Sequence, residues 1–401
     1  MTLKQIPIKS LKAGMHITKL DIPWMESPFI RHHLTIKSAN DIKKLLNAGV
    51  KNVTIDTSKG TDVVACLQET LKKDVEPSNN AKVFKKVTLE QELNVAKKLR
   101  GSITSLAENI NEALKNDKAI GLEQVAPLIE GTLKSLGRND QAMTTLVNMQ
   151  RKAVNLSTHA FATFCLALNL SIKMNLDASA QQALGLAALF HDSGWLKLPL
   201  NLLGKNSAYT ANERKLTEQH IAIGSKLLEK NCELPELAMR IIEEHHEYCN
   251  GLGYPQKLTG NEIHSLSKLF CIIDLYDELV HGLLDQPAMT PNGALAYLYK
   301  KTKQDCLDES IVSNLVVILG VYPIGSIVQL SNKEKGLVFE INRDQPKEPK
   351  VKIYYDKSGT AHAEPRIIDL ANQKGQSFLV VTNVLDSKVQ GTDPAHLMEL
   401  T

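Results

Sequence analysis

The chain has 401 residues, of which 23% are charged and 43% belong to the hydrophobic class, and its formal net charge is +3. This balance is ordinary for a globular protein and gives no argument for a nucleic-acid partner, which usually requires a concentrated basic patch, so we expect none. At roughly 100–200 residues per domain, the length predicts more than one domain.

No segment has the character of a membrane span. The most apolar run, residues 311–321, is interrupted by Ser313 and Asn314, and a spanning helix needs about 20 apolar residues. The first residues lack the apolar core of a signal peptide. The six cysteines form no CxxC pair, which indicates neither a disulfide framework nor a thiolate zinc site. We therefore expect a cytoplasmic protein.

Residues 1–73 are predicted to form a small α+β domain. Residues 16–20 and 50–55 alternate between apolar and polar side chains, as strands do. Ser38 is expected to cap a helix over residues 39–47, which Gly49 would close.

Residues 74–139 are predicted to be a linker followed by a helical connector. The segment is poor in apolar residues at first and rich in Lys, Pro, Ser and Asn. Helical periodicity then predicts helices over about 88–115 and 123–136.

Residues 140–320 have helical periodicity nearly throughout and are predicted to form an all-α domain. From Tyr322 the pattern changes, and residues 326–330, 337–341 and 351–355 are predicted strands. Residues 321–386 are therefore expected to be a small β-barrel-like module. The fold class is multi-domain and mainly α.

The all-α domain carries an unusual set of histidines and aspartates. His191-Asp192 ends an apolar helix, and the adjacent pair His245-His246 ends another. Asp274 lies inside an apolar stretch, where a buried carboxylate needs a compensating partner. With two further helical histidines, the set has seven members: His159, His191, Asp192, His220, His245, His246 and Asp274.

Each of these residues alone has an ordinary structural explanation, and a helical bundle with unrelated surface histidines is the alternative for the whole set. Together they favour a metal centre. Imidazole and carboxylate ligands without thiolates suit Fe, Mn, Ni or Zn. Asp192 could bridge two ions, and two ions about 3.5–4 Å apart can support phosphoryl displacement.

The segment Gly253-Tyr254-Pro255 follows the second histidine pair. By itself it is typical of a tight loop, in which glycine supplies a positive φ and proline fixes the exit. Next to two histidines it indicates a loop beside a site, with a protein contact surface as a further possibility.

The chain resembles the HD-GYP phosphodiesterase family over residues 145–320. His191-Asp192-Ser193-Gly194 resembles the HD motif, and residues 245–255, HHEYCNGLGYP, resemble the HHExxDGxGYP signature. Residues 258–263 and 274–277 continue the resemblance in register. Residues 11–15 and 27–29 resemble a domain of unknown function often fused ahead of this family, and the β module resembles the tail of the same architecture.

The resemblance implies hydrolysis of cyclic di-GMP to pGpG or GMP through a metal-bound hydroxide. Two divalent transition-metal ions are implied, most often Fe or Mn, with His191 and Asp192 as the catalytic residues. One ion would be held by His159, His191, Asp192 and Asp274, and the other by Asp192, His220, His245 and His246.

The sequence departs from the family at several positions. Trp195 stands where the HD motif usually continues with Lys, and Leu283 stands where an Arg usually holds substrate phosphate. Asn250 replaces the Asp of the longer signature. Asn155 stands where some members carry a Glu that helps to bind a third metal, so the expectation here is two ions.

These departures bear on which residues contact the substrate and on which function the protein has. Substrate contact is predicted for Trp195, Lys197 and the loop of Gly253, Tyr254 and Pro255. Lys197, Lys205 or Arg240 could supply the missing positive charge. One alternative is a degenerate HD-GYP protein that binds metal or nucleotide and signals through protein contacts at the Gly-Tyr-Pro loop. Another is a hydrolase of a different phosphoester.

Overall fold

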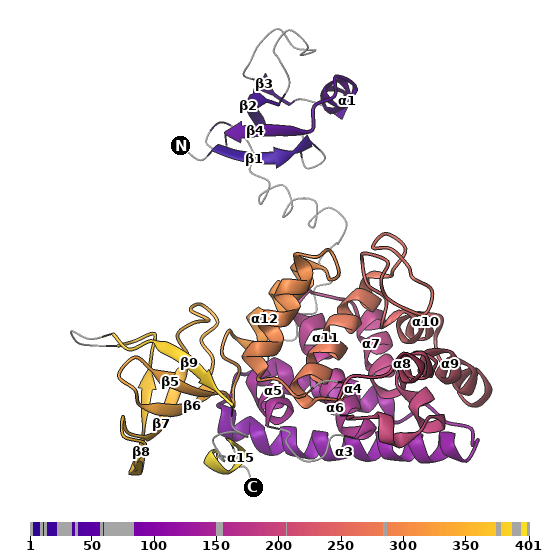
Figure 1. Ribbon diagram of the computed structural model, residues 1–401, viewed down its shortest axis with the longest axis vertical. Coiled ribbons are helices and arrows are strands. Elements are labelled where there is room, and N and C mark those ends of the chain that lie inside the picture. The colour runs from indigo at the N-terminus through magenta and orange to yellow at the C-terminus, as the bar shows by residue number, and fades with distance from the viewer. Residues whose placement is uncertain are drawn as a thin grey trace. The chain divides into compact units, whose positions relative to one another are not determined.

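The structure is a computed structural model (Figure 1). It describes residues 3–8, 11, 14–21, 34–36, 39–56, 59, 84–149, 155–205, 207–283, 285, 287–373, 378–386 and 394–398. The chain divides into two compact units, residues 1–83 and 84–401. None of the described helices has the length and apolar character needed to cross a membrane.

The first unit is a small antiparallel sheet with one helix. Strands β1 (Leu3–Pro7), β2 (His16–Leu20), β3 (Leu34–Thr35) and β4 (Asn52–Asp56) pair in the order β1-β4-β2-β3, and α1 spans Ala39–Asn47. Alternate residues such as Ile17, Val53 and Ile55 are buried, as the strand period requires. The predicted α+β character is confirmed, whereas Ser38 and residues 27–29 lie outside the described residues.

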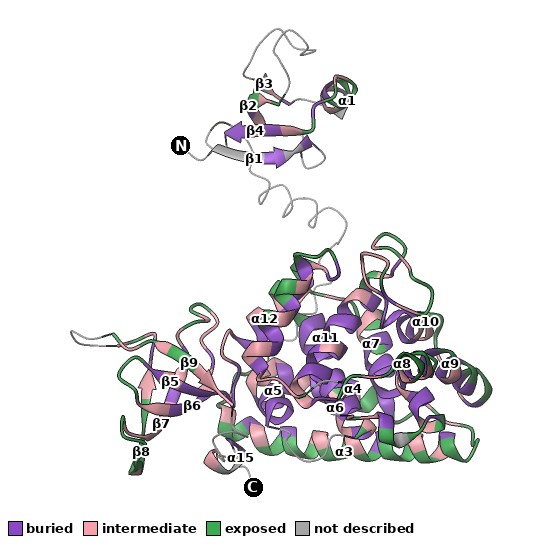
Figure 2. Cartoon of the chain, viewed as in Figure 1, coloured by how far each residue is buried: buried purple, intermediate pink, exposed green. Residues whose placement is uncertain are grey.

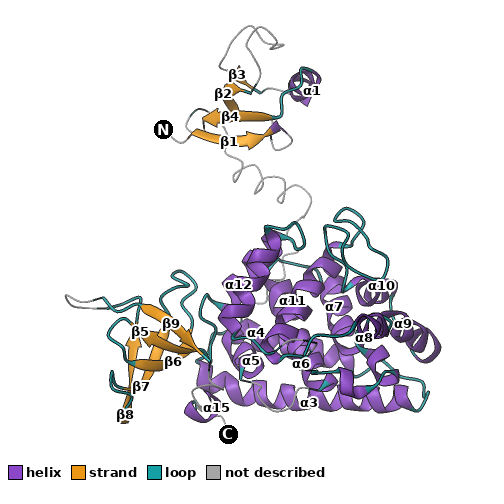
Figure 3. Ribbon diagram, in the orientation of Figure 1, coloured by secondary structure: helices purple, strands orange, loops and turns teal. Residues whose placement is uncertain are grey.

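The second unit is built on helices (Figure 3). Their bounds are α3 Leu89–Lys115, α4 Val125–Arg138, α5 Asp140–Asn148, α6 Leu156–Lys173, α7 Ala178–Phe190, α8 Ala211–Thr217, α9 His220–Asn231, α10 Glu236–Glu244, α11 Ser265–His281, α12 Pro291–Thr302 and α13 Glu309–Leu319. Two short 3-10 helices, Ser193–Lys197 and Leu200–Leu202, follow α7.

Helices α6, α7 and α11 form the centre of this unit. Figure 2 shows them buried along most of their length, while α3 keeps an exposed outer face. Ile103 of α3 and Ile129 of α4 share one apolar core with Phe164 of α6. The helices predicted as a connector therefore pack into the same core as the rest of the unit, and the domain boundaries at 73, 139 and 320 stay predictions.

A five-stranded antiparallel sheet follows the helices. Strands β5 (Ile327–Leu330), β6 (Lys335–Glu340), β7 (Lys350–Tyr355), β8 (Ala361–Asp369) and β9 (Val381–Leu385) pair in the order β8-β7-β6-β5-β9, and a short helix α15 spans Pro394–Leu397. Gln141 of α5 joins the sheet to the helices, because its side-chain oxygen accepts from the Ile341 amide at 2.9 Å. The predicted fold class is confirmed.

Candidate metal centre

The seven predicted ligands come from five places in the helical unit and converge on one point. His159 lies in the first turn of α6, and Asp274 lies in the middle of α11. His191-Asp192 directly follows α7, His220 begins α9, and His245-His246 directly follows α10. The ends of four helices therefore surround the long buried α11.

The start of α6 shows why His159 is held in place. Asn155 caps the helix: its side-chain oxygen accepts from the Thr158 amide at 2.9 Å, and the Thr158 hydroxyl accepts from the Asn155 amide at 3.1 Å. Such a reciprocal cap fixes the direction of the first turn. Asn155 thus has a structural function at the position where some family members carry a metal-binding Glu.

The first group of ligands surrounds His159. Its Nε2 lies 3.1 Å from Nε2 of His191 and 2.9 Å from Oδ1 of Asp274. Oδ2 of Asp192 lies 3.5 Å from the same nitrogen of His191. His159, His191 and Asp274 are almost completely buried.

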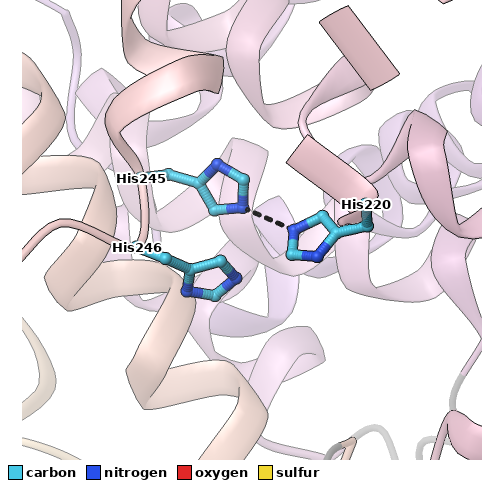
Figure 4. A group of neighbouring side chains, drawn as sticks. All are labelled: His220, His245 and His246. Carbon is cyan, nitrogen blue, oxygen red and sulfur yellow. Dashed lines mark hydrogen bonds between the residues drawn. The ribbon is translucent and has the colours of Figure 1, made fainter. Parts of the chain in front are cut away.

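The second group consists of three imidazoles, His220, His245 and His246 (Figure 4). Nε2 of His220 lies 3.3 Å from Nε2 of His245. The rings of His245 and His246 lie side by side, with their centroids 4.2 Å apart. Figure 4 shows the two adjacent histidines approaching His220 from the opposite side.

Asp192 lies between the two groups. Its Oδ2 faces His191, as above, and its Oδ1 lies 3.8 Å from Nε2 of His220. Each carboxylate oxygen therefore faces a different group, which is the arrangement that a bridging ligand requires. The Asp192 side chain is 16% exposed, against 1% for His191, so the centre opens to solvent on the side of Asp192.

Four of the five histidines are anchored through the nitrogen that points away from the centre. Nδ1 of His191 lies 3.3 Å from the carbonyl oxygen of Ala188, and Nδ1 of His220 lies 2.6 Å from that of Thr217. Nδ1 of His245 lies 2.6 Å from the carbonyl oxygen of Ile242. The acceptor for Nδ1 of His159 is the carboxylate of Asp277, at 2.7 Å. An acceptor at Nδ1 places the proton there, so Nε2 of a neutral ring keeps its lone pair. These lone pairs face one another.

Burial determines the charge of the second group. It lowers the pKa of His245 to about 3, and it also lowers the pKa of His220 and of His246. These three rings are therefore neutral at pH 7, which is the form that binds metal.

The first group behaves differently without a cation. Burial opposes the charged form of His159, but its hydrogen bonds to Asp274 and Asp277 outweigh burial and raise its pKa. The pKa of His191 is also raised, because the charge of Asp192 and the bond to Asp274 overcome burial. Positive charge is therefore favoured at these two imidazoles.

The donor set fits a pair of divalent transition-metal ions. Nitrogen lone pairs directed at one another at 3.1 Å and 3.3 Å repel unless a proton or a cation lies between them. Imidazole with carboxylate is a common ligand set for Fe, Mn and Zn, and anchoring of the opposite nitrogen is the usual support for a metal-binding histidine.

Three buried carboxylates beside the centre were not among the predicted site residues. Asp277 holds His159, Glu278 follows it on α11, and Glu247 follows the histidine pair. Burial and then the charge of Asp274 raise the pKa of Glu278. Asp277 lies four residues before His281 and pairs with it at 2.9 Å. The i, i+4 spacing of these two residues in a helix could have indicated this pair from the sequence.

Glu247 shapes the Gly-Tyr-Pro loop. Its carboxylate accepts from the backbone amides of Gln256, Lys257 and Leu258 at 2.6, 3.0 and 3.0 Å. A side chain at Gly253 would meet the Tyr248 amide nitrogen at 2.4 Å, so only glycine fits there.

The loop itself lies against the centre. The Tyr254 ring stacks on His246 with centroids 4.8 Å apart, and the next residue, Pro255, is exposed. Leu252, just before Gly253, is 78% exposed. The structure thus brings this loop to the second histidine group.

The predicted contact of substrate with Trp195 is not favoured by the structure. The Trp195 side chain is 2% exposed, packs against Leu198 and Leu202, and stacks on His220 with centroids 5.5 Å apart. Its position is that of a support behind a ligand. Leu283, where an Arg was expected, is 3% exposed.

The cations proposed to replace the missing charge have other partners. Lys197 is exposed, and its amine donates to the carbonyl oxygen of Lys115 at 3.3 Å, so its contact with substrate stays a prediction. Lys205 pairs with Glu213 at 2.7 Å. Arg240 pairs with Glu244 at 2.7 Å.

Comparisons with known proteins agree with this geometry. An HD domain profile matches residues 123–311, a domain of unknown function (DUF3391) matches residues 3–125, and a KOW domain associated with HD domains matches residues 327–387. Residues 123–311 are an HD domain. The HD domain contains all seven predicted ligands, and the two flanking matches confirm the architecture that the sequence resemblance predicted.

Curated relatives and one solved structure are similar to this chain. A cyclic di-GMP phosphodiesterase of Pseudomonas aeruginosa is 26% identical over 94% of this chain and 91% of its own length. The cyclic di-GMP phosphodiesterase response regulator RpfG of Xanthomonas campestris is 30% identical over 32% of this chain and 34% of its own. The structure titled Bd1817, an HDGYP protein from Bdellovibrio bacteriovorus, aligns with 79% of this chain and 99% of that chain, at 19% identity and a TM-score of 0.48.

Proposed function

We propose that the protein is a metal-dependent phosphodiesterase that hydrolyses cyclic di-GMP to pGpG and GMP. The observation that carries the proposal is the position of Asp192, whose two oxygens face two separate histidine groups. A relative named as a cyclic di-GMP phosphodiesterase, which aligns over 94% of this chain, supports the substrate.

In this proposal the chain holds two divalent ions, most often Fe or Mn, through the seven ligands. When bound, such a pair lowers the pKa of water and stabilises charge on the phosphate oxygens. His159, His191 and Asp274 would hold one ion, and His220, His245 and His246 would hold the other. Asp192, on the side that is open to solvent, would serve both.

The loop of Gly253, Tyr254 and Pro255 is proposed to border the substrate. Tyr254 is half-buried against His246, so its ring can limit how a nucleotide enters beside the second ion. Because Trp195 and Leu283 are buried and apolar, neither supplies a charge for the second phosphate of the substrate. Each charge-assisted contact contributes about 1.5–3 kcal/mol, and we therefore propose slow turnover.

A second function is a signalling role through protein contacts at this loop, next to which Leu252 is 78% exposed. In that case the metal centre would serve binding, and the loop would report to a signalling partner. The cytoplasmic location expected from the sequence remains a prediction.

The test compares three substrates with protein loaded with Fe or Mn: cyclic di-GMP, pGpG and cyclic GMP-AMP. Hydrolysis of cyclic di-GMP at the highest rate supports the proposal. Preference for pGpG or cyclic GMP-AMP would reassign the substrate. Tight binding of cyclic di-GMP without hydrolysis, by protein that carries both ions, would favour the signalling function.

A further inference from the structure

A third group of potential ligands lies next to the two groups already described. It consists of His246, Asp274 and Glu278, whose ligand atoms lie within 4.8 Å of one another and which are all buried. Glu278 follows Asp274 by one helical turn on α11, and its side chain therefore points the same way. The predicted set of seven ligands does not contain Glu278.

Asp274 connects this third group to the first. Its Oδ1 lies 2.9 Å from Nε2 of His159, whereas its Oδ2 lies 3.8 Å from Nδ1 of His246. The two oxygens face in different directions, as those of Asp192 do. One oxygen of Asp274 is therefore free to bind on the side of Glu278.

The Glu278 carboxylate lacks a compensating partner. Within the described part of the chain this carboxylate makes no hydrogen bond or ion pair, although Glu278 is only 6% exposed. Its neighbour Asp277, in contrast, is bonded to His159 at 2.7 Å. Two carboxylates, Asp274 and Glu278, thus approach each other in a buried space, where an uncompensated charge is strongly unfavourable.

We propose that His246, Asp274 and Glu278 form an additional binding position for a divalent cation beside the two-ion centre. This inference rests on the proposed metal centre. Two carboxylates and one imidazole favour Mn, Fe or Zn. Because His246 also belongs to the second group, the two positions share its ring, and the additional ion binds more weakly than the other two.

The experiment is a titration of full-length protein with Mn²⁺, followed by elemental analysis after removal of free metal at each concentration. Wild type is expected to bind two ions at low Mn²⁺ and a further ion at high Mn²⁺. The variant Glu278→Gln has the shape of a protonated glutamate but no charge. It is expected to keep the two tight ions and to weaken the further ion at least about tenfold, since loss of even an outer-shell partner of a metal ligand costs about that much.

A matched control is Glu92→Gln. Glu92 is also a buried glutamate of the helical core, but it pairs with Arg138 at 2.7 Å. This control variant is expected to keep the full titration of wild type.

The possible outcomes separate this inference from the proposed function. Two ions in wild type with no further uptake, or an unchanged titration in Glu278→Gln, would overturn the additional position and leave the two-ion centre standing. In that event Glu278 carries a proton. Absence of any bound ion in wild type would overturn both.

Discussion

At the scale of single residues, the position of Asp192 decides how the centre is organised. The aspartate faces both histidine groups, at 3.5 Å and 3.8 Å. Removing one oxygen ligand from each ion should therefore affect both ions, whereas loss of a histidine should affect mainly one.

We predict that Asp192→Asn lowers the metal content of the purified protein below two ions per chain. Elemental analysis of protein from iron- and manganese-supplied cells measures this. Asp356→Asn, at a surface turn of the β module, is the control and should keep wild-type content. Two ions per chain in Asp192→Asn would show that this carboxylate is not a bridge.

Asp277 is proposed to orient the metal ligand His159 without binding metal itself. It accepts a hydrogen bond from Nδ1 of His159 at 2.7 Å, which directs the lone pair of Nε2 towards the centre. We predict that Asp277→Asn weakens metal binding about 10- to 100-fold while the number of ions at saturation stays the same. A metal titration distinguishes the two quantities, and a loss of stoichiometry at saturating metal would mean that Asp277 acts otherwise.

At the scale of elements, the centre depends on close contact between the 3-10 helix Ser193–Lys197 and the start of α9. A side chain at Gly194 would meet the carbonyl oxygen of His220 at 1.8 Å. No L side chain fits that space. Only a glycine at position 194 therefore allows the segment after the HD motif to approach the backbone of His220 this closely.

We predict that Gly194→Ala displaces His220, lowers metal content and lowers the melting temperature. Gly101→Ala is the matched control, because a side chain at Gly101 of α3 meets nothing within 4 Å. Alanine in a helix interior is favoured over glycine by about 0.5–1 kcal/mol, so the control should melt at the same or a higher temperature. Normal metal content in Gly194→Ala would contradict this account of the contact.

The element scale also shows what the sequence can and cannot predict. Helices α3 and α4 and strands β5 to β7 follow periodic apolar patterns, so the sequence predicts them within a few residues. Strand β8 was missed, because it is an edge strand with mostly exposed side chains and contains Pro365. Strand β9 was missed for a similar reason, since its side chains are exposed or half-buried.

The candidate ligands of the metal centre could be predicted from the sequence, whereas the residues packed around them could not. The His-Asp and His-His pairs stand out as adjacent letters, and the structure brings all seven candidates together. Trp195 and Glu278 could not be assigned in this way, because burial and side-chain direction depend on packing between helices. The sequence places Trp195 next to the HD motif, but only the fold shows it behind His220.

At the scale of the whole molecule, the metal centre belongs entirely to the second compact unit, residues 84–401. We predict that this unit, produced alone, binds two ions and melts at the same temperature as the corresponding transition of the full chain. Calorimetry with elemental analysis of both proteins measures this. A unit that does not fold, or that folds without metal, would show that residues 1–83 are needed to build the centre.

The central claim is that a two-ion centre in this chain hydrolyses cyclic di-GMP, and the most direct test is the hydrolysis rate as a function of bound metal per chain. The account predicts no turnover by metal-free protein, and slow formation of pGpG that rises as the second ion binds. Fully loaded protein that never forms pGpG, or metal-free protein that forms it equally fast, would contradict the account.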